Sequence, residues 1–219
     1  MEIPQTHPWV QTVAEARLIQ NQLRSQVITT DKISTVNYVA GVDVGFKDNY
    51  RTTQAAVVVL GFPQLQVVEK AVSQCPTTFP YIPGFLSFRE IPALLQALAK
   101  IKITPDLILC DGQGLAHPRR FGLACHLGVL LDLPTIGVAK SLFVGEHEAV
   151  GREKGSWQPL QYEGDTIGAV VRSRTDVKPI YVSIGHRLSL ATAIDYVLHC
   201  TPKYRLPETT RQADKLASS

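Results

Sequence analysis

The chain has 219 residues, of which 45% are hydrophobic and 19% are charged, and its formal net charge is +3. This composition excludes a disordered chain and fits one domain with a buried core, which we expect to span residues 1–219. No apolar run reaches the roughly 18–20 residues of a membrane span, so we expect no membrane partner. The small positive charge permits a nucleic-acid partner without arguing for one.

The first half of the chain predicts a helix followed by an antiparallel meander. Apolar residues at helical spacing predict a helix over 9–27. Strand-like runs follow at 37–45, 54–60 and 65–73, separated by short breaks rich in turn residues. Short links favour antiparallel pairing. An early proline in the next apolar pattern predicts a helix over 91–102.

The second half alternates between strands and helices. A strand over 106–111, a helix over 119–131 and a strand over 134–139 indicate a parallel βαβ unit. The remaining pattern predicts smaller strands within 145–178, a strand over 179–184, a helix over 187–199 and a polar tail over 201–219. We therefore expect an α/β fold with a mixed five-stranded sheet and helices on both faces. Its first and fourth strands can lie side by side, an arrangement that resembles the ribonuclease H-like fold.

The cysteines and the start of the chain indicate where the protein works. The four cysteines lie far apart and form no CxxC pair, and Cys110 and Cys125 fall in apolar runs typical of core residues. This usage favours a reducing compartment. The first residues lack the basic and apolar regions of a secretory leader. We expect a cytoplasmic protein.

Two acidic residues follow apolar strand patterns. Asp43 follows Val-Ala-Gly-Val and Asp111 follows Leu-Ile-Leu-Cys. A carboxylate at the end of a buried strand must be paired or must bind a metal. With Glu90 as a third acid nearby, the site would be all oxygen, which suits Mg²⁺ or Mn²⁺. Each acid also has an ordinary interpretation, as a turn residue or a helix first-turn acid, but the coincidence at two strand ends favours a metal site.

A stiff segment lies between these acids. It reads Pro80, Tyr81, Ile82, Pro83 and Gly84. The prolines restrict the backbone, and glycine permits a tight turn. Such a loop can hold Tyr81 rigidly at a surface, either as an ordinary packing residue or as a ring that stacks on or wedges between nucleobases.

Two further residues are candidates for phosphate contacts. His117 lies in a loop that begins with Gly112 and precedes two arginines. There it could orient water or bind phosphate, although a lone loop histidine is usually only solvated. Lys140 follows a short strand and would point to the same rim as Asp111, where it could neutralise a phosphate or remain a solvated charge.

Together these motifs resemble the endonuclease V family, the deoxyinosine 3′ endonucleases of bacterial DNA repair. The resemblance runs in order along nearly the whole chain and rests on residues 39–44, 80–90, 110–128, 137–141, 182–186 and 204–214. It implies a ribonuclease H-like fold and a Mg²⁺ cofactor, with Mn²⁺ as a substitute. It places the metal carboxylates on Asp43, Glu90 and Asp111, the wedge on Tyr81, the loop histidine on His117, the site lysine on Lys140 and a C-terminal helix position near the metal on Asp214.

The resemblance also implies the reaction. The second phosphodiester bond 3′ to a deaminated base, chiefly hypoxanthine, is cleaved to leave a 3′-hydroxyl and a 5′-phosphate. Backbone amides near Gly84 and Gly112 are candidates for reading the base. The expected partner is DNA with deoxyinosine or other deaminated bases; inosine-containing RNA stays open, and a monomer is expected.

Three other functions are alternatives to this one. Another ribonuclease H-like nuclease, acting on junctions or hybrids, fits the acids, but cutting a backbone does not need the loop of Tyr81. A protein that binds inosine without cutting would be expected to lack a carboxylate, yet all three are present. An α/β domain that binds a small ligand is the third alternative.

Overall fold

The structure, a computed structural model, describes residue 3 and residues 7–219. In this part of the chain the helices are α1 (Val13–Leu23), α2 (Leu86–Leu98), α3 (Leu123–Leu131), α4 (Leu190–His199) and α5 (Glu208–Ala217). The strands are β1 (Tyr38–Lys47), β2 (Thr52–Gly61), β3 (Val67–Pro76), β4 (Leu107–Asp111), β5 (Thr135–Ala139), β6 (Trp157–Tyr162), β7 (Asp165–Val171) and β8 (Ile180–His186). Residues 1–2 and 4–6, on which the expectation of no leader partly depends, lie outside the described residues.

All of these strands join one mixed sheet in the order β3-β2-β1-β4-β5-β8-β7-β6. The first five positions are the ribonuclease H-like order that the sequence predicts, with β1 antiparallel to β2 and parallel to β4. The predicted fold class is therefore confirmed. The sheet is also wider than the predicted five strands, because β8 pairs antiparallel with β5 and carries β7 and β6 beyond it.

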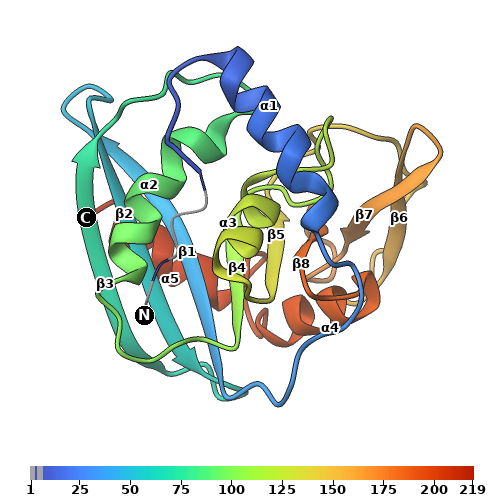
Figure 1. Cartoon of the computed structure of the whole chain (residues 1–219). Helices are drawn as coiled ribbons and strands as arrows, with labels where there is room; N and C mark the ends of the chain where they lie inside the picture. Colours follow the sequence, from blue (N-terminus) through green and yellow to red (C-terminus); the bar gives the residue numbers. More distant parts are fainter. Residues whose placement is uncertain (1–2, 4–6) are drawn as a thin grey trace.

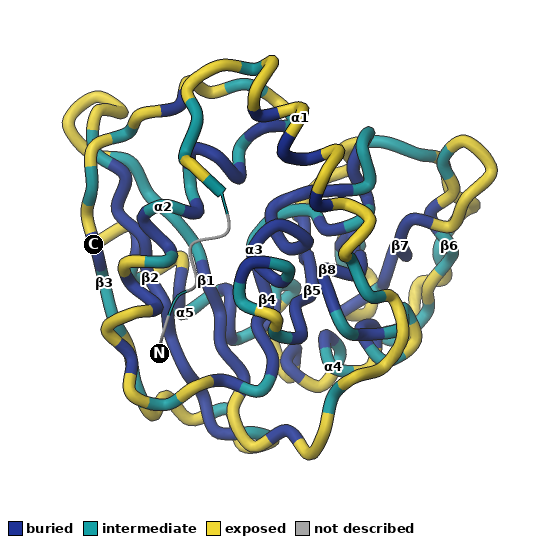
Figure 2. The backbone as a smooth tube through the Cα atoms, viewed as in Figure 1, coloured by how far each residue is buried: buried dark blue, intermediate teal, exposed yellow. Residues whose placement is uncertain are grey.

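Helices cover both faces of the sheet (Figure 1). Successive side chains of β1 point to opposite faces of the sheet, so they pack against different helical layers. Ala40 and Val42 pack in one apolar cluster with α2 and α3, whereas Val39 packs in another with α4 and α5. Figure 2 shows that the strands between the helical layers are buried along most of their length.

The four predicted helices begin three to five residues away from their predicted starts, and two of these differences bear on the site. The predicted helix 91–102 begins at Leu86, so Glu90 lies inside α2 and Pro92 is in its interior. Burial of Phe88 and Ile91 offsets the hydrogen bond that Pro92 cannot donate. The predicted helix 119–131 begins only at Leu123, because the backbone at Arg120 is left-handed, with φ of 55°.

The segment predicted as a polar tail contains α5, which packs directly on β1. A Cβ atom on Gly41 would lie 2.0 Å from the carbonyl oxygen of Thr209, and one on Gly45 would lie 2.5 Å from that of Ala217. Only glycine therefore permits this approach of helix and strand. The small side chain of Ala213 is fully buried in the same interface. Close packing fixes α5 across β1.

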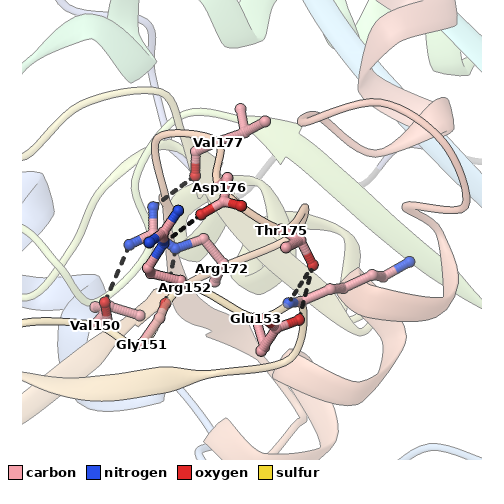
Figure 3. A network of polar contacts seen from close by, with 9 residues as sticks. Val150, Gly151, Arg152, Glu153, Arg172, Thr175, Asp176 and Val177 are labelled. Carbon is pink, nitrogen blue, oxygen red and sulfur yellow. Dashed lines mark hydrogen bonds and ion pairs between the residues drawn. The ribbon is translucent and has the colours of Figure 1, made fainter.

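The widened end of the sheet is held by a polar network (Figure 3). The guanidinium group of Arg172 donates to the carbonyl oxygens of Val150, Gly151 and Val177 at 2.6–3.1 Å. Arg152 forms an ion pair with Asp176 at 2.5 Å. These contacts tie the loop before β6 to the loop after β7. Arg152 and Arg172, the arginines of this network, thus pair with groups of the protein itself.

Two expectations from composition concern the cysteines and the length of apolar helices. The four cysteines are free, and Cys110 and Cys125 are buried, in agreement with their prediction as core residues. Cys200 is buried as well. Among the described residues, no helix has both the length and the apolar character that crossing a membrane requires.

Candidate active site

Asp43 and Asp111 meet where two parallel strands separate. The paired residues of β1 and β4 end at Val42 and Cys110, and the next residue on each strand is the aspartate. Val42 and Cys110 face α2 and α3, so alternation turns both aspartates towards α5. The sequence predicts Asp43 at the end of its strand. This prediction is wrong, because β1 continues to Lys47 beside β2. It lies at the point where β1 loses its partner β4.

Asp214 on α5 completes a carboxylate cluster with these two aspartates. One carboxylate oxygen from each of Asp43, Asp111 and Asp214 lies within 4.8 Å of the other two. Asp43 and Asp111 are partly buried, and Asp214 is exposed. Oxygen-only donors converging from three elements fit a small divalent cation such as Mg²⁺.

Glu90 reaches the same region from α2, on the opposite face of the sheet. It is not part of the tight oxygen cluster, but it lines one cavity with Asp111. Burial, followed by the charges of Asp43 and Asp111, raises the pKa of Glu90 to about 8. Burial and the charge of Asp111 likewise raise the pKa of Asp43 to about 7. Such crowded carboxyl groups ionise more readily when a cation lies among them.

Lys140 supplies one positive charge to this cluster. Its Nζ atom lies 2.5 Å from Asp111 Oδ2 and 4.0 Å from Asp214 Oδ1. Partial burial alone would lower the pKa of Lys140, but the hydrogen bond and charge of Asp111 raise it, so the ammonium form persists. Burial nevertheless raises the pKa of Asp111 despite this partner. One lysine does not balance the acidic charge of the site.

The Tyr81 loop, residues 80–84, borders a cavity of about 340 Å³ next to the cluster. Tyr81 is 69% exposed and Pro80 and Pro83 are also exposed, whereas Ile82 packs beside a buried cluster that includes Phe79 and Phe85. The cavity is further lined by Glu90, Lys140, Leu142 and Phe143. An exposed aromatic ring thus lies at the rim of a cavity that Glu90, Asp111 and Lys140 also line.

The carbonyl oxygen of Gly84 anchors this loop. It accepts hydrogen bonds from Gln20 Nε2 at 2.9 Å, His117 Nε2 at 3.0 Å and Arg119 Nη2 at 2.6 Å. Gln20 Oε1 also accepts from Arg119 Nε at 2.6 Å. Sequence reasoning missed Gln20. The available signal was a polar residue on the buried stripe of α1, between Ile19 and Leu23.

His117 serves this anchor with both ring nitrogens. Its Nδ1 accepts from the backbone N–H of Arg119 at 3.1 Å, which leaves the proton on Nε2 for Gly84. Burial, and then the charge of Arg119, lowers the pKa of His117 to about 4. The imidazole is therefore neutral at pH 7, and it carries no charge to offer a phosphate.

The backbone N–H groups near Gly84 and Gly112 differ in whether they already donate a hydrogen bond within the protein. The Gly112 N–H donates to Val138 O at 3.2 Å, and the Gly114 N–H donates to Ser183 Oγ at 2.9 Å. Neither is free to read a base in this arrangement. The Gly84 N–H has no acceptor among the described residues and lies on the wall of the cavity.

A family model matches most of the chain. The model of the family described as Endonuclease V matches residues 21–215. The endonuclease V of Rippkaea orientalis is 66% identical over 219 residues, which covers 100% of this chain and 96% of that protein.

Solved structures agree with this match. The crystal structure of endonuclease V from Streptomyces avermitilis superposes with a TM-score of 0.92 at 48% identity, over 99% of this chain and 95% of that one. Endonuclease V from Ciona intestinalis superposes with a TM-score of 0.82 at 33% identity, over 94% of this chain and 96% of that one. The Ciona protein was solved in complex with a 24mer DNA containing an inosine followed by a ribo-adenosine.

Proposed function

Because the chain belongs to the endonuclease V family, we propose that it is a repair endonuclease that recognises deaminated bases in DNA, chiefly hypoxanthine. It hydrolyses the second phosphodiester bond 3′ to the altered base and leaves a 3′-hydroxyl and a 5′-phosphate. The observation that carries this proposal is the position of the carboxylate cluster and Lys140 beside a cavity bordered by the Tyr81 loop. Base recognition and backbone cleavage then take place in adjoining sites.

We propose Mg²⁺ as the cofactor, with Mn²⁺ as a substitute. Asp43, Asp111 and Asp214 would hold it, and Glu90 would contribute from the opposite face of the sheet. When bound, the metal activates water and stabilises charge on the phosphate oxygens. Lys140 lies within reach of the same oxygens and neutralises the phosphate after exchanging its contact with Asp111.

The Tyr81 loop supplies selectivity in this proposal. Tyr81 wedges into the base stack, and the altered base turns into the adjoining cavity. A mispaired base costs less to turn out than a paired one, which favours lesions over normal pairs. The free Gly84 N–H is the backbone donor best placed to read the base. His117 holds Gly84 in place and does not contribute charge.

The scope of the substrate forms a second part of the proposal. The Ciona relative binds a DNA in which a ribo-adenosine follows the inosine, so a ribose next to the lesion is compatible with the fold of this family. Inosine-containing RNA is therefore a second candidate substrate. We further propose that residues 1–219 act as one domain, as a monomer, in the cytoplasm, where free cysteines are maintained.

A cleavage assay tests the proposal. End-labelled duplexes with one central inosine are compared with inosine-free duplexes and a single-inosine RNA, each with Mg²⁺ or with EDTA. We expect one metal-dependent nick, one nucleotide beyond the inosine, and its loss in Asp43→Ala. Cleavage by Asp43→Ala at the wild-type rate, or activity confined to junctions or hybrids, would contradict the proposal.

A further inference from the structure

A basic aromatic patch borders the carboxylate cluster on the α5 side of the sheet, opposite the face that carries α2. It consists of Lys203, Tyr204 and Arg211, and we call it the Tyr204 patch. The guanidinium carbon of Arg211 lies 3.9 Å from the centroid of the Tyr204 ring, and Lys203 Nζ lies 5.4 Å from it. Tyr204 is 40% exposed. One aromatic ring thus holds two cations at the surface.

Two links place this patch next to the site of cleavage. Arg211 and Asp214 lie three residues apart on α5, so their side chains are neighbours on the surface of that helix. Arg205, the residue after Tyr204, donates from Nη2 to the carbonyl oxygen of Lys140 at 2.6 Å. The patch therefore lies next to Asp214 on α5 and next to the residue that holds the backbone of the site lysine.

The polar groups of the patch are largely available to a ligand. Arg211 Nε donates to Glu208 Oε2 at 3.1 Å, but the two terminal nitrogens of Arg211 have no acceptor among the described residues. Glu208, the acid facing the patch, is also held by Gln212 Nε2 at 2.6 Å. The Tyr204 hydroxyl likewise has no hydrogen-bond partner among the described residues. An exposed ring with free cationic donors suits a base and its phosphates.

We propose that the Tyr204 patch binds the DNA strand on the 3′ side of the cut, with Tyr204 stacked on a base and Lys203 and Arg211 on phosphates. The inference rests on the proposed function, which places the lesion in the cavity beside Tyr81. A strand that runs from that cavity past Asp111 and Lys140 reaches α5 after the scissile phosphate. The patch then secures the downstream nucleotides while the bond is cut.

The test uses two inosine duplexes that differ only in the nicked strand, which either continues beyond the cut or ends one nucleotide after it. For the wild type we expect truncation to lower kcat/KM about tenfold, within the range of one base stacked on an aromatic ring. Tyr204→Ala should lose about tenfold on the long duplex and little more on truncation. Tyr204→Phe keeps the stacking ring and should restore the wild-type pattern.

Two further variants separate a role in binding from one in folding. Tyr38 is 37% exposed and lies five residues before Asp43 on β1, roughly 17 Å away, so Tyr38→Ala should keep the wild-type truncation penalty. Arg211→Gln should reduce the slope of log(kcat/KM) against log[salt] by about 1. If truncation lowered the kcat/KM of Tyr204→Ala as much as that of wild type, the inference about the patch would be overturned and the proposed function would stand. A wild type that cuts neither duplex would overturn the proposed function with it, before any variant is compared.

Discussion

Lys140 Nζ lies 2.5 Å from Asp111 Oδ2, so an ammonium group already occupies the edge of the carboxylate cluster. This contact gives the site one fixed positive charge, held by β5 beside β4. Burial, and then the neighbouring acids, raise the pKa values of Asp43 and Glu90, and the charge of Lys140 does not offset them.

Asp214→Asn removes one charge from the proposed metal site without changing side-chain volume. We expect Mg²⁺-dependent cleavage of an inosine duplex to fall by at least about a hundredfold, the upper range for loss of a group that only supports a metal ligand. Mg²⁺ affinity, measured by titration of thermal stability, should fall as well. Asp195→Asn on α4 is the matched control, because Asp195 is 66% exposed and Asp214 is 57% exposed. Equal activity of the two variants would contradict the assignment.

The metal-free protein should lose stability as pH rises. The pKa values of Asp43 and Glu90 are raised from 3.8 and 4.5 to about 7 and about 8, so the folded protein holds protons that the unfolded chain releases. Their stabilising contribution is fully present below the unfolded values of 3.8 and 4.5, and it is lost progressively as pH rises from there to about 7–8. Glu90→Gln removes one of these titrating groups. In EDTA, the Tm of Glu90→Gln minus the Tm of wild type should therefore be larger at about pH 8.5 than at about pH 5.5.

Mg²⁺ should reverse this trend, because it binds the ionised carboxylates. We expect the gain in Tm on adding Mg²⁺, and the rate of cleavage, to rise across the same pH window. A Tm difference between Glu90→Gln and wild type that does not change with pH in EDTA would show that Glu90 does not titrate there.

Tyr81→Ala tests the wedge. Because Tyr81 is 69% exposed, we expect thermal stability to be unchanged. Cleavage of the inosine duplex should fall about 10- to 100-fold, the range for losing one aromatic–base stack. Tyr50→Ala is the matched control, since Tyr50 is 66% exposed in the turn between β1 and β2. If Tyr50→Ala lost as much activity as Tyr81→Ala, the effect could not be attributed to a wedge.

Gln20→Met tests the anchor of the Tyr81 loop. The substitution keeps side-chain length but leaves Arg119 Nε without its acceptor and removes one donor from Gly84 O. We expect a loss of about 1–3 kcal/mol in the free energy of unfolding, with a lower kcat/KM on inosine duplexes. The exposed Gln22→Met on α1 is the control. In a Tyr81→Ala background, Gln20→Met should reduce activity little further, whereas full additivity would argue against a role through the loop.

Gly41→Ala tests the packing that brings Asp214 to the site. The new Cβ would collide with the carbonyl oxygen of Thr209 at 2.0 Å, and α5 would have to move. We expect a loss of about 1–3 kcal/mol in denaturant unfolding. Mg²⁺ affinity should fall with it. Gly151→Ala is the control, because its Cβ would meet only the side chain of Ser156. Wild-type Mg²⁺ affinity in Gly41→Ala would show that the cluster does not need α5 in this position.

Local patterns in the sequence determined the first five strands and the meeting of two acids. Strand and turn patterns are set by neighbouring residues, and a short antiparallel meander followed by a βαβ unit leaves few ways to order a sheet. From that order the approach of Asp43 and Asp111 follows, as the pairing of β1 with β4 confirms. The resemblance to the endonuclease V family, which the family match confirms, pointed to the same acids.

Only the tertiary structure decided which other groups join them. The helix α5 is polar on average, and the face that it buries carries small or hydroxyl side chains, namely Thr209, Thr210, Ala213 and Ala217. It packs closely on Gly41 and Gly45, and its sequence reads as a polar tail. The anchoring of Gly84 by Gln20 joins residues 64 positions apart, and no local pattern records such a contact. The Gly112 amide is likewise engaged by Val138 on the neighbouring strand β5, which no local pattern shows. Contacts between distant segments are fixed by packing and hydrogen bonding in three dimensions, and these contacts, more than the residues themselves, shape the site.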